Sequence, residues 1–401
     1  MRRAVVLVIA LALGAAVTGI GGPADASGPT VGPAREAGPA IDGDTNDAAT
    51  IGVAFDGTNE LLVWTRLQPG TARSGDIMAA RVAPDGTVLD PGGFVVAATS
   101  ADEEFADASF DGTNFIVAWQ AGIHPKVRAA RISPAGVVLD APPLALGQGG
   151  GPEVASTSTG ISLVTWAGTT DSGDSDAVLA RRLSSDGAVL DAAPGIVLDT
   201  IDAPDNALYP IDAASNGDGF VVLETSCYQC PESYQGSVRA VSADGHKGAA
   251  ANTPLESSSI ASNGSDYLLA ANVCAVSEGC DFGGDYDIYT ARVSADLVVS
   301  PWRVAADGAA LQLAPEVAFS GGHYLVAYRR QGGNGMVDIR ASLLSKDGST
   351  VDVAGLIVAP DIDPGAAYKA VSAVKGGRFL VAYHDEVSDH TAVVERTVSP
   401  K

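Results

Sequence analysis

The chain of 401 residues carries 48 acidic and 24 basic side chains, which gives a formal net charge of −24. A surface this acidic repels phosphodiester backbones and anionic lipid, which argues against nucleic acid as a partner. The length would accommodate two or three domains of average size, but one repeat runs from about residue 50 to the C-terminus and indicates a single closed body.

Residues 1–26 differ from the rest of the chain. Arg2 and Arg3 precede an uncharged run from Ala4 to Val17, and the small residues Ala24 and Ala26 follow it. This order is typical of a secretory signal peptide. The apolar run is too short to span a bilayer, and no later stretch approaches the roughly twenty residues that a span needs. We therefore expect an exported, secreted protein without a membrane span.

A short phrase then returns seven times: a tight turn, an apolar run, and often an aromatic residue at its end. The copies begin at Phe55, Phe110, Thr157, Ser215, Ser262, Phe319 and Val374. Most of their turns are of the Asp-Gly or Asn-Gly kind, which tolerates the positive φ of a two-residue hairpin. The copies are 47 to 58 residues apart, a period typical of a four-stranded unit that must stack on copies of itself.

Each unit can be divided into four strands. The first precedes the turn, as in Ile51 to Phe55, and the second is the apolar run, as in Phe115 to Trp119. The third follows a variable loop, beginning at Asp76 in the first unit, and the fourth, as in Phe94 to Val96, follows a second tight turn. The second strands are apolar on both faces, so each sheet is expected to be covered on both sides.

The sequence therefore predicts an all-β fold, a seven-bladed β-propeller of four-stranded antiparallel blades. The last unit lacks a fourth strand, so residues 31–41 are expected to supply it and to close the ring. Residues 27–401 would form this single domain, with blades at 50–98, 104–148, 151–199, 209–251, 257–307, 314–360 and 368–400. A parallel β-helix or a two-sheet sandwich is the alternative, although β-helix coils usually have about half this period.

Once assembled, the unit resembles a group of bacterial exported repeat proteins. The resemblance is carried by FDGTNFIVAW from Phe110 and by DIMAARVAPDG from Asp76. It implies a propeller in a secreted or surface protein and implies no particular activity. Ser184 to Gly187 and Ser345 to Gly348 approach the aspartate box of sialidases, but Gly follows Asp directly and the Trp is missing. Sialidase chemistry is therefore not implied.

In such a ring, the loops between second and third strands and those between blades fall on one face, which we call the long-loop face. Nearly all variation in loop length occurs there, so binding residues are expected on this face. Residues that recur at equivalent positions are expected to serve the scaffold: Arg81, Arg131, Arg182, Arg292, Asp90, Asp140, Asp191, Asp352, Trp64, Trp119 and Trp166.

The fourth to sixth units break the repeat most. The loops from Thr225 to Gly236 and from Asn272 to Asp287 carry all four cysteines: Cys227, Cys230, Cys274 and Cys280. An exported chain favours disulfides, and of the three pairings we expect the two local ones, Cys227 with Cys230 and Cys274 with Cys280. A zinc ion held by four thiolates is the alternative. Mass spectrometry of unreduced peptides separates the two.

Ligand-binding side chains are expected in and beside these loops, where tyrosines can stack on sugar rings. The predicted set is Tyr209, Tyr228, Tyr234, Asp285, Tyr286, Arg329 and Arg330. Asp171, Asp174 and Asp176 crowd oxygen ligands into the third unit's loop, where they could bind calcium as a cofactor. The alternative is simple packing for the tyrosines and solvent exposure for the aspartates.

No nucleophile elbow, zinc-protease helix or phosphate-binding loop occurs in the sequence. The favoured interpretation is a monomeric, non-catalytic secreted binding protein whose long-loop face takes a glycan, peptide or envelope partner. The alternative is a carbohydrate-active enzyme, either a glycoside hydrolase or a polysaccharide lyase. In that case His384 or Tyr368 would transfer the proton, with Asp385 as partner of His384, and Arg329 or Arg330 would hold a carboxylate.

Overall fold

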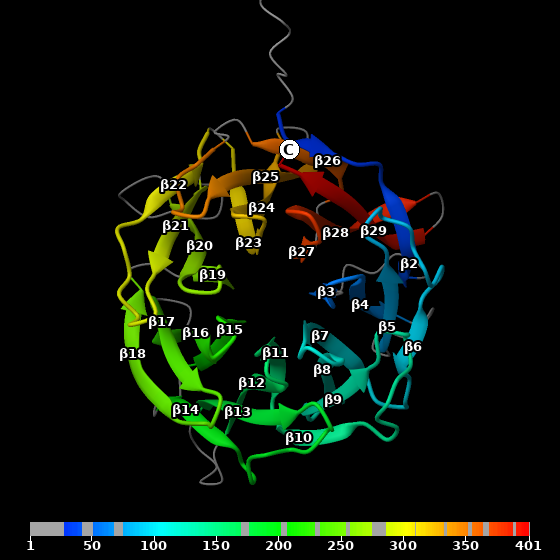
Figure 1. Ribbon diagram of the computed structural model, residues 1–401, viewed down its shortest axis with the longest axis vertical. Coiled ribbons are helices and arrows are strands. Elements are labelled where there is room, and N and C mark those ends of the chain that lie inside the picture. Colours follow the sequence, from blue (N-terminus) through cyan, green and yellow to red (C-terminus); the bar gives the residue numbers. More distant parts are fainter. Residues whose placement is uncertain are drawn as a thin grey trace, which may run out of the picture.

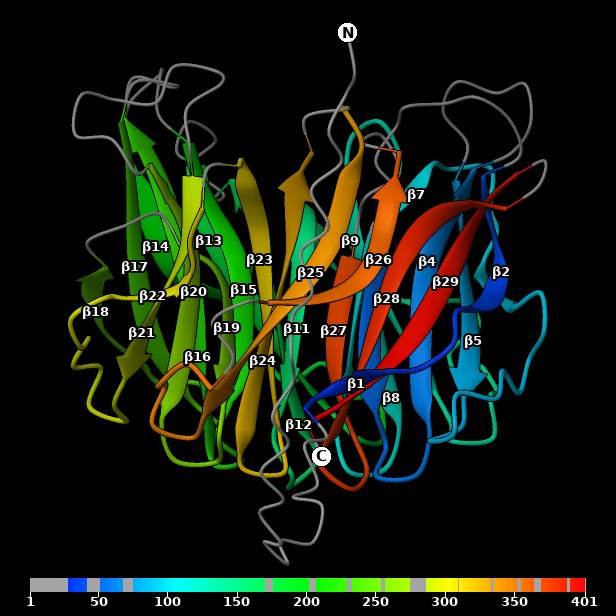
Figure 2. The same ribbon diagram turned by 90° about the horizontal axis from the view of Figure 1, so that it is seen from above.

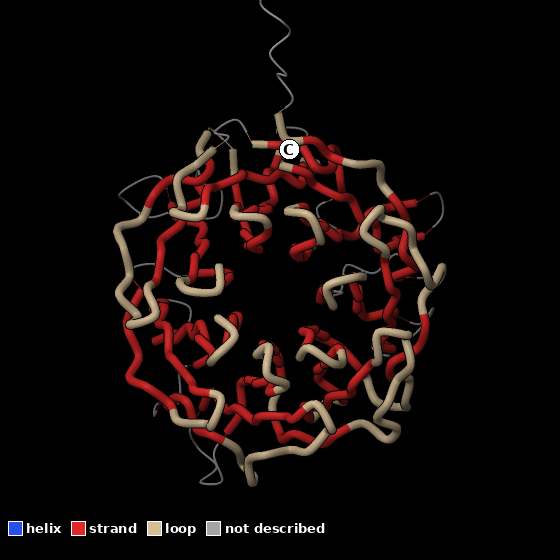
Figure 3. The backbone as a smooth tube through the Cα atoms, in the orientation of Figure 1, coloured by secondary structure: helices blue, strands red, loops and turns tan. Residues whose placement is uncertain are grey.

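The computed structural model is a ring of radially arranged sheets without a helix among the described residues (Figures 1 and 3). The structure describes residues 28–41, 51–67, 75–169, 176–201, 207–228, 233–253, 257–274, 286–308, 310–332, 335–351, 355–363, 369–387 and 390–400. The leader predicted at residues 1–26 lies outside these ranges. The part of the chain described contains no helix that is long and apolar enough to cross a membrane.

The strands form seven blades, and in blades 1 to 6 they follow one another from the axis outward. Blades 1 and 2 contain β3 (Ile51–Phe55), β4 (Glu60–Leu67), β5 (Gly75–Val82), β6 (Phe94–Ala97), β7 (Glu103–Phe110), β8 (Phe115–Ala121), β9 (Lys126–Ile132) and β10 (Leu144–Gln148). Blades 3 and 4 contain β11 (Gly150–Ser156), β12 (Ile161–Thr169), β13 (Asp176–Ser184), β14 (Ile196–Ile201), β15 (Ala207–Ser215), β16 (Gly219–Tyr228), β17 (Ser233–Ser242) and β18 (Lys247–Thr253). Blades 5 and 6 contain β19 (Ser257–Ser262), β20 (Tyr267–Cys274), β21 (Tyr286–Val293), β22 (Arg303–Ala306), β23 (Gln312–Ser320), β24 (His323–Gln331), β25 (Val337–Ser345) and β26 (Leu356–Ile362). Blade 7 contains β27 (Lys369–Val374), β28 (Arg378–Val387) and β29 (His390–Ser399), together with β1 (Thr30–Val31) and β2 (Arg35–Ile41).

Blade 7 is completed from both ends of the chain. β1 and β2 pair antiparallel with β29, so the N-terminal segment supplies the outer strand of the last blade. β2 also makes a one-residue parallel bridge to β4 through Ile41 and Leu67, which joins blades 7 and 1. The strands run along the ring axis and end at two rims (Figure 2). The predicted seven-bladed propeller and its closing strand are thus confirmed.

The hydrophobic core is divided among the blade interfaces. The described residues form seven buried clusters, each shared by two neighbouring blades. In β8, Phe115, Val117 and Trp119 pack towards blade 1, whereas Ile116 and Ala118 pack towards blade 3. The second strands are apolar without alternation because each of their faces meets another sheet.

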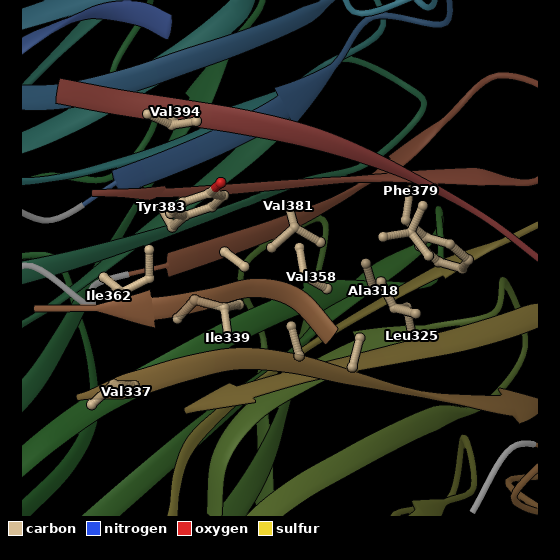
Figure 4. Packing of buried hydrophobic residues seen from close by; sticks show 14 of the residues in the cluster. Ala318, Leu325, Val337, Ile339, Val358, Ile362, Phe379, Val381, Tyr383 and Val394 are labelled. Atoms are coloured by element: carbon tan, nitrogen blue, oxygen red, sulfur yellow. The ribbon is translucent and has the colours of Figure 1, made fainter. Parts of the chain in front are cut away.

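Figure 4 shows the cluster between blades 6 and 7. Phe379 and Val381 of β28 lie there with Leu325 of β24 and Ile339 of β25, and all four are almost fully buried. Each interface repeats this arrangement with different side chains, so stability depends on closing the ring: an unpartnered blade would expose one such surface.

Arginine–aspartate pairs fasten several blades to their neighbours. Arg131 Nη2 lies 2.8 Å from Asp140 Oδ1 in blade 2, and its Nη1 donates to the carbonyl of Ser185 in blade 3 (2.9 Å). The arrangement recurs for Arg81 with Asp90 and Pro134, and for Arg182 with Asp191 and Ala243. A bidentate pair fixes the guanidinium plane, and the remaining N–H group then reaches across the interface. The predicted scaffold role is confirmed for these residues.

Blade 5 departs from this pattern. The backbone N–H of Arg292 donates to the hydroxyl of Ser300 (2.9 Å), where blades 1 to 3 have an aspartate, and its guanidinium pairs with Asp266 of the same blade. Asp352 lies outside the described residues. At the ring closure, Arg35 of β2 donates to the carbonyl of Asp85 in blade 1. The closing strand therefore brings its own inter-blade contact.

Candidate binding site: a carboxylate ring in the central cavity

The seven inner strands are arranged around the axis of the ring (Figure 1), and residues from all seven line a cavity of about 490 Å³. Each inner strand has one residue that pairs with the fourth residue of the apolar run in the second strand of its blade. This residue is polar in five consecutive blades, from blade 2 to blade 6. From blade 1 to blade 7 it is occupied by Gly52, Asp107, Glu153, Asp212, Ser259, Glu316 and Ala370. All seven line the cavity. We call Asp107, Glu153, Asp212 and Glu316 the carboxylate ring.

The backbone is deformed where these polar side chains enter the cavity. In blades 2 to 6 the register of the inner strand shifts immediately before the polar residue, whereas the inner ladders of blades 1 and 7 are regular. Two residues ahead of Asp107 and Glu316, Phe105 and Ala314 have φ angles of 54° and 50°. Bulges re-aim side chains, and such strained φ angles cluster at functional sites. The deformation therefore marks the ring as more than a repeat of the scaffold.

Two members of the ring also connect blades. Asp107 Oδ2 accepts the backbone N–H of Val154 (2.8 Å), which ties blade 2 to blade 3. Asp212 Oδ2 accepts the backbone N–H of Ile260 (2.8 Å) and the hydroxyl of Ser259 (2.9 Å), which ties blade 4 to blade 5. These bonds hold both carboxyl groups in place and leave part of each facing the cavity.

Three members of the ring retain their protons to unusually high pH. Burial raises the pKa of Asp107 to about 7 and that of Asp212 to about 6, despite their hydrogen bonds. The pKa of Glu153 is raised well above its usual value, first by burial and then by the charges of Asp107, Asp212 and Glu316. No described residue donates a hydrogen bond to the carboxyl group of Glu153. A positively charged group in the cavity would relieve this repulsion and displace the protons.

The carboxyl groups of the ring come from four different blades. Among the described residues, no three His, Cys, Asp or Glu side chains are placed to hold one metal ion. An ammonium or guanidinium group spreads its charge and its N–H donors over several atoms, and it can contact carboxylates on different blades. The calcium site predicted at Asp171, Asp174 and Asp176 remains a prediction, because those side chains lie outside the described part of the chain.

Two of the loops predicted to carry the ligand are shorter than expected. β16 and β17 remain paired up to Tyr228 and Ser233, and β20 and β21 up to Cys274 and Tyr286. The polar residues after each apolar run continue the hairpin because backbone pairing does not require apolar side chains. Tyr209 lies in β15, three residues before Asp212, and is 47% exposed.

Several predicted site residues have side chains outside the described part of the chain: Cys227, Cys230, Cys274, Cys280, Tyr228, Tyr234, Asp285 and Tyr368. The disulfide and zinc hypotheses therefore both remain predictions.

The two ionisable pairs expected after the second strands lie inside those strands instead. His384 and Asp385 belong to β28, and Arg329 and Arg330 belong to β24. His384 is 1% exposed, and burial lowers its pKa to about 4, so the imidazole is neutral at neutral pH. A side chain this buried offers a substrate almost no surface. Arg330 Nη1 lies 3.9 Å from Asp338 Oδ2 in the neighbouring strand.

The carboxylate ring was absent from the sequence prediction, although a signal was present. When the seven units are aligned on their first turns, an acidic residue falls at or near the same place in four of them. Recurring residues were assigned to the scaffold, and the longer first turn of blade 3 moves Glu153 by one residue in the alignment. The convergence becomes visible only once the inner strands are placed around one axis.

No protein-family model matches the sequence, and no curated protein matches it. Among solved structures, the chain is similar to the β-propeller domain of the Trilobed protease from Pyrococcus furiosus, with 10% identity, a TM-score of 0.46, and coverage of 86% of this chain and 96% of that one. It is also similar to Trypanosoma rangeli sialidase, with 10% identity, a TM-score of 0.47 and coverage of 90% and 57%, and to the polysaccharide lyase Uly1, with 8% identity, a TM-score of 0.48 and coverage of 89% and 90%. The chain thus spans little more than half of the sialidase. At these values no activity carries over to this chain.

Proposed function

We propose that this protein is a non-catalytic binding protein that receives a positively charged organic group in its central cavity. The observation that carries the proposal is the carboxyl group of Glu153, which faces three further carboxyl groups and receives no hydrogen bond from a described residue. Ionisation of such a group is unfavourable in the empty cavity and becomes favourable when a cation enters.

The ligand class that fits best is a basic peptide. A lysine or arginine side chain supplies the charge, and a cavity of about 490 Å³ is large enough to accept it. The rest of the peptide would lie towards the long-loop face, where Tyr209 offers an exposed aromatic surface near the start of β15. A neutral glycan would leave the carboxylates without a counter-charge. Export and a monomeric state belong to the proposal and are supported by the leader-like residues 1–26 and by the ring's self-closure.

Isothermal titration calorimetry with Nα-acetyl-L-arginine amide tests the proposal, with the nearly isosteric but uncharged Nα-acetyl-L-citrulline amide as ligand control. We expect binding of the acetylated arginine amide alone, and a loss of at least tenfold in affinity for Glu153→Gln. Asp218→Asn, an exposed charge in a turn of blade 4, is the matched control variant and should bind like the wild type. Affinity should rise between pH 5.5 and pH 8 as the ring loses its protons, with a net release of protons on binding. Equal binding of both amides would refute the proposal.

A carbohydrate-active enzyme is the second candidate, and one observation favours it. Asp107 and Asp212 line the same cavity with pKa values of about 7 and about 6, and glycoside hydrolysis uses a pair of carboxyl groups with different proton affinities. The ring would then replace His384 as the catalytic group. New reducing ends or unsaturated products from a polysaccharide panel, lost in Asp107→Asn, would establish this function in place of binding.

A further inference from the structure

A second cavity of about 470 Å³ lies at the interface of blades 1 and 2. We call it the blade 2 cleft and define it by Trp119, Arg128, His124, Lys126, Pro142 and Pro143. The walls come from β8, β9 and the loops beside them in blade 2, and Thr99 of the connection from blade 1 and Glu103 at the start of β7 complete it. None of these residues belongs to the central cavity, so the cleft is a separate site.

Arg128 interrupts the repeat in the cleft. It pairs with Trp119 across β8 and β9. The same position is Met78 opposite Trp64 in blade 1 and Leu179 opposite Trp166 in blade 3, and both are almost fully buried. A guanidinium therefore stands where blades 1 and 3 have an apolar side chain. Blade 6 also has an arginine at this position, Arg340 opposite Tyr328, but that guanidinium pairs with Asp338. No hydrogen bond or ion pair joins Arg128 to another described residue.

Trp119 offers an unsatisfied donor in the same cleft. In blade 3, the indole N–H of Trp166 donates to the carbonyl of Gln148 in the preceding blade (2.9 Å). The indole N–H of Trp119 has no partner among the described residues, although the side chain is only 1% exposed. Buried donors are nearly always satisfied, so this one indicates an acceptor that enters the cleft.

The charges around the cleft are arranged for an anion, in contrast to the acidity of the whole chain. His124 and Lys126 are exposed at its edge and, like Arg128, have no partner among the described residues. The one carboxyl group in the wall, Glu103, is 1% exposed and accepts hydrogen bonds from the hydroxyl and the backbone N–H of Thr99. Three basic groups thus face the cleft while the acid is already bonded.

We propose that the blade 2 cleft binds a small organic carboxylate with a ring-sized body. The guanidinium of Arg128 holds the carboxylate in a bidentate arrangement, and the indole N–H of Trp119 donates to a ligand oxygen. The body of the ligand packs against Trp119, Pro142 and Pro143, which make much of the wall apolar. A sugar acid and a hydrocarbon ring acid share this chemistry. The site does not depend on the proposed function of the central cavity.

Calorimetric titration of the intact protein with D-galacturonate and with benzoate tests the proposal, and D-galactose is the neutral control. We expect at least one acid to bind and galactose not to bind. A preference for galacturonate identifies the ligand as a sugar acid, and a preference for benzoate identifies it as a hydrocarbon ring acid. Binding of neither acid would overturn the proposal, as would binding of galactose as tight as that of galacturonate.

Arg128→Leu is the decisive variant because it restores the type of residue that blade 3 has at this position, so the fold should tolerate it. It should weaken binding of the preferred acid at least tenfold. Arg128→Lys keeps the positive charge but cannot bind the carboxylate in a bidentate arrangement, so its loss of affinity should be smaller. Lys346→Met removes an exposed positive charge from blade 6 and should change nothing. Nα-Acetyl-L-arginine amide should bind the Arg128→Leu protein as it binds the wild type, which separates the two cavities. Unchanged acid binding by Arg128→Leu would overturn the assignment.

Discussion

Replacing Asp107 by Asn should stabilise the protein at neutral and alkaline pH. The amide keeps an oxygen that can accept the N–H of Val154, so the tie between blades 2 and 3 survives while the charge disappears. Burial raises the pKa of Asp107 from 3.8 to about 7. Between these two values the folded state holds a proton that the unfolded chain has released. The free energy of unfolding therefore falls as pH rises through this window, and the loss is complete above pH 7.

The magnitude follows from the same pKa. A rise from 3.8 to about 7 corresponds to about 4 kcal/mol, an upper limit because part of the repulsion is shared with other members of the ring. Urea unfolding at intervals from pH 4 to pH 9, followed by far-ultraviolet circular dichroism, measures it. The stability of Asp107→Asn relative to wild type should increase steadily from pH 4 to pH 7 and then level off.

Asp218→Asn controls for the loss of one negative charge from an acidic protein, because this side chain is exposed. Its stability relative to wild type should vary little over the same range. Parallel pH profiles for wild type and Asp107→Asn would show that Asp107 has an ordinary pKa, and the reasoning about the carboxylate ring would fail with it.

Three further predictions concern the scaffold. Arg131→Ala should lower the free energy of unfolding by about 2–3 kcal/mol, because Asp140 stays largely buried without its guanidinium partner and the contact to Ser185 is lost. Urea denaturation measures this loss. A smaller loss than that of Lys375→Ala, which changes an exposed residue, would contradict the prediction. Arg35→Ala should weaken the pairing of the closing strand. Hydrogen exchange should then be faster in β2 and β29 than in β12 and β13. Uniform exchange rates would show that Arg35 does not stabilise the ring closure. Gly147→Ala should lower the free energy of unfolding by about 1–3 kcal/mol and shift the tryptophan fluorescence, since a Cβ there would lie 2.7 Å from Trp166 Cζ2. The control Gly248→Ala meets only ordinary contacts and should be tolerated. Equal effects of the two substitutions would be evidence against the close approach.

Architecture was predictable because it depends on features that recur. The turn pairs, the apolar runs and the period of 47 to 58 residues each specify the same unit, so errors at one copy are corrected by the others. The missing fourth strand of the last unit likewise pointed to the N-terminal segment. The pairing of Arg131 with Asp140 could be anticipated because both residues recur at one spacing in three blades.

The details of the sites depend on features that occur once or leave no compositional trace. A one-residue shift of register changes which way a side chain points, yet Phe105 and Ala314 give no sign that their φ angles are positive. His384 follows an apolar run and precedes an acid, a pattern that suits a loop as well as a strand. Only the ladder of β28 with β29, which continues to Val387 and His390, places it in the sheet.

The assumption that recurring residues serve the scaffold holds at the rim of a propeller and fails at its axis. On the third strands, copies of a residue lie on separate blades away from the axis, so each charge needs its own partner, as Arg131 has in Asp140. On the innermost strands the copies converge on one cavity, where the charges of Asp107, Asp212 and Glu316 add to burial in raising the pKa of Glu153. A charge that recurs on the inner strands is therefore costly to the fold alone, and this cost is the reason that we propose a ligand of opposite charge for the central cavity.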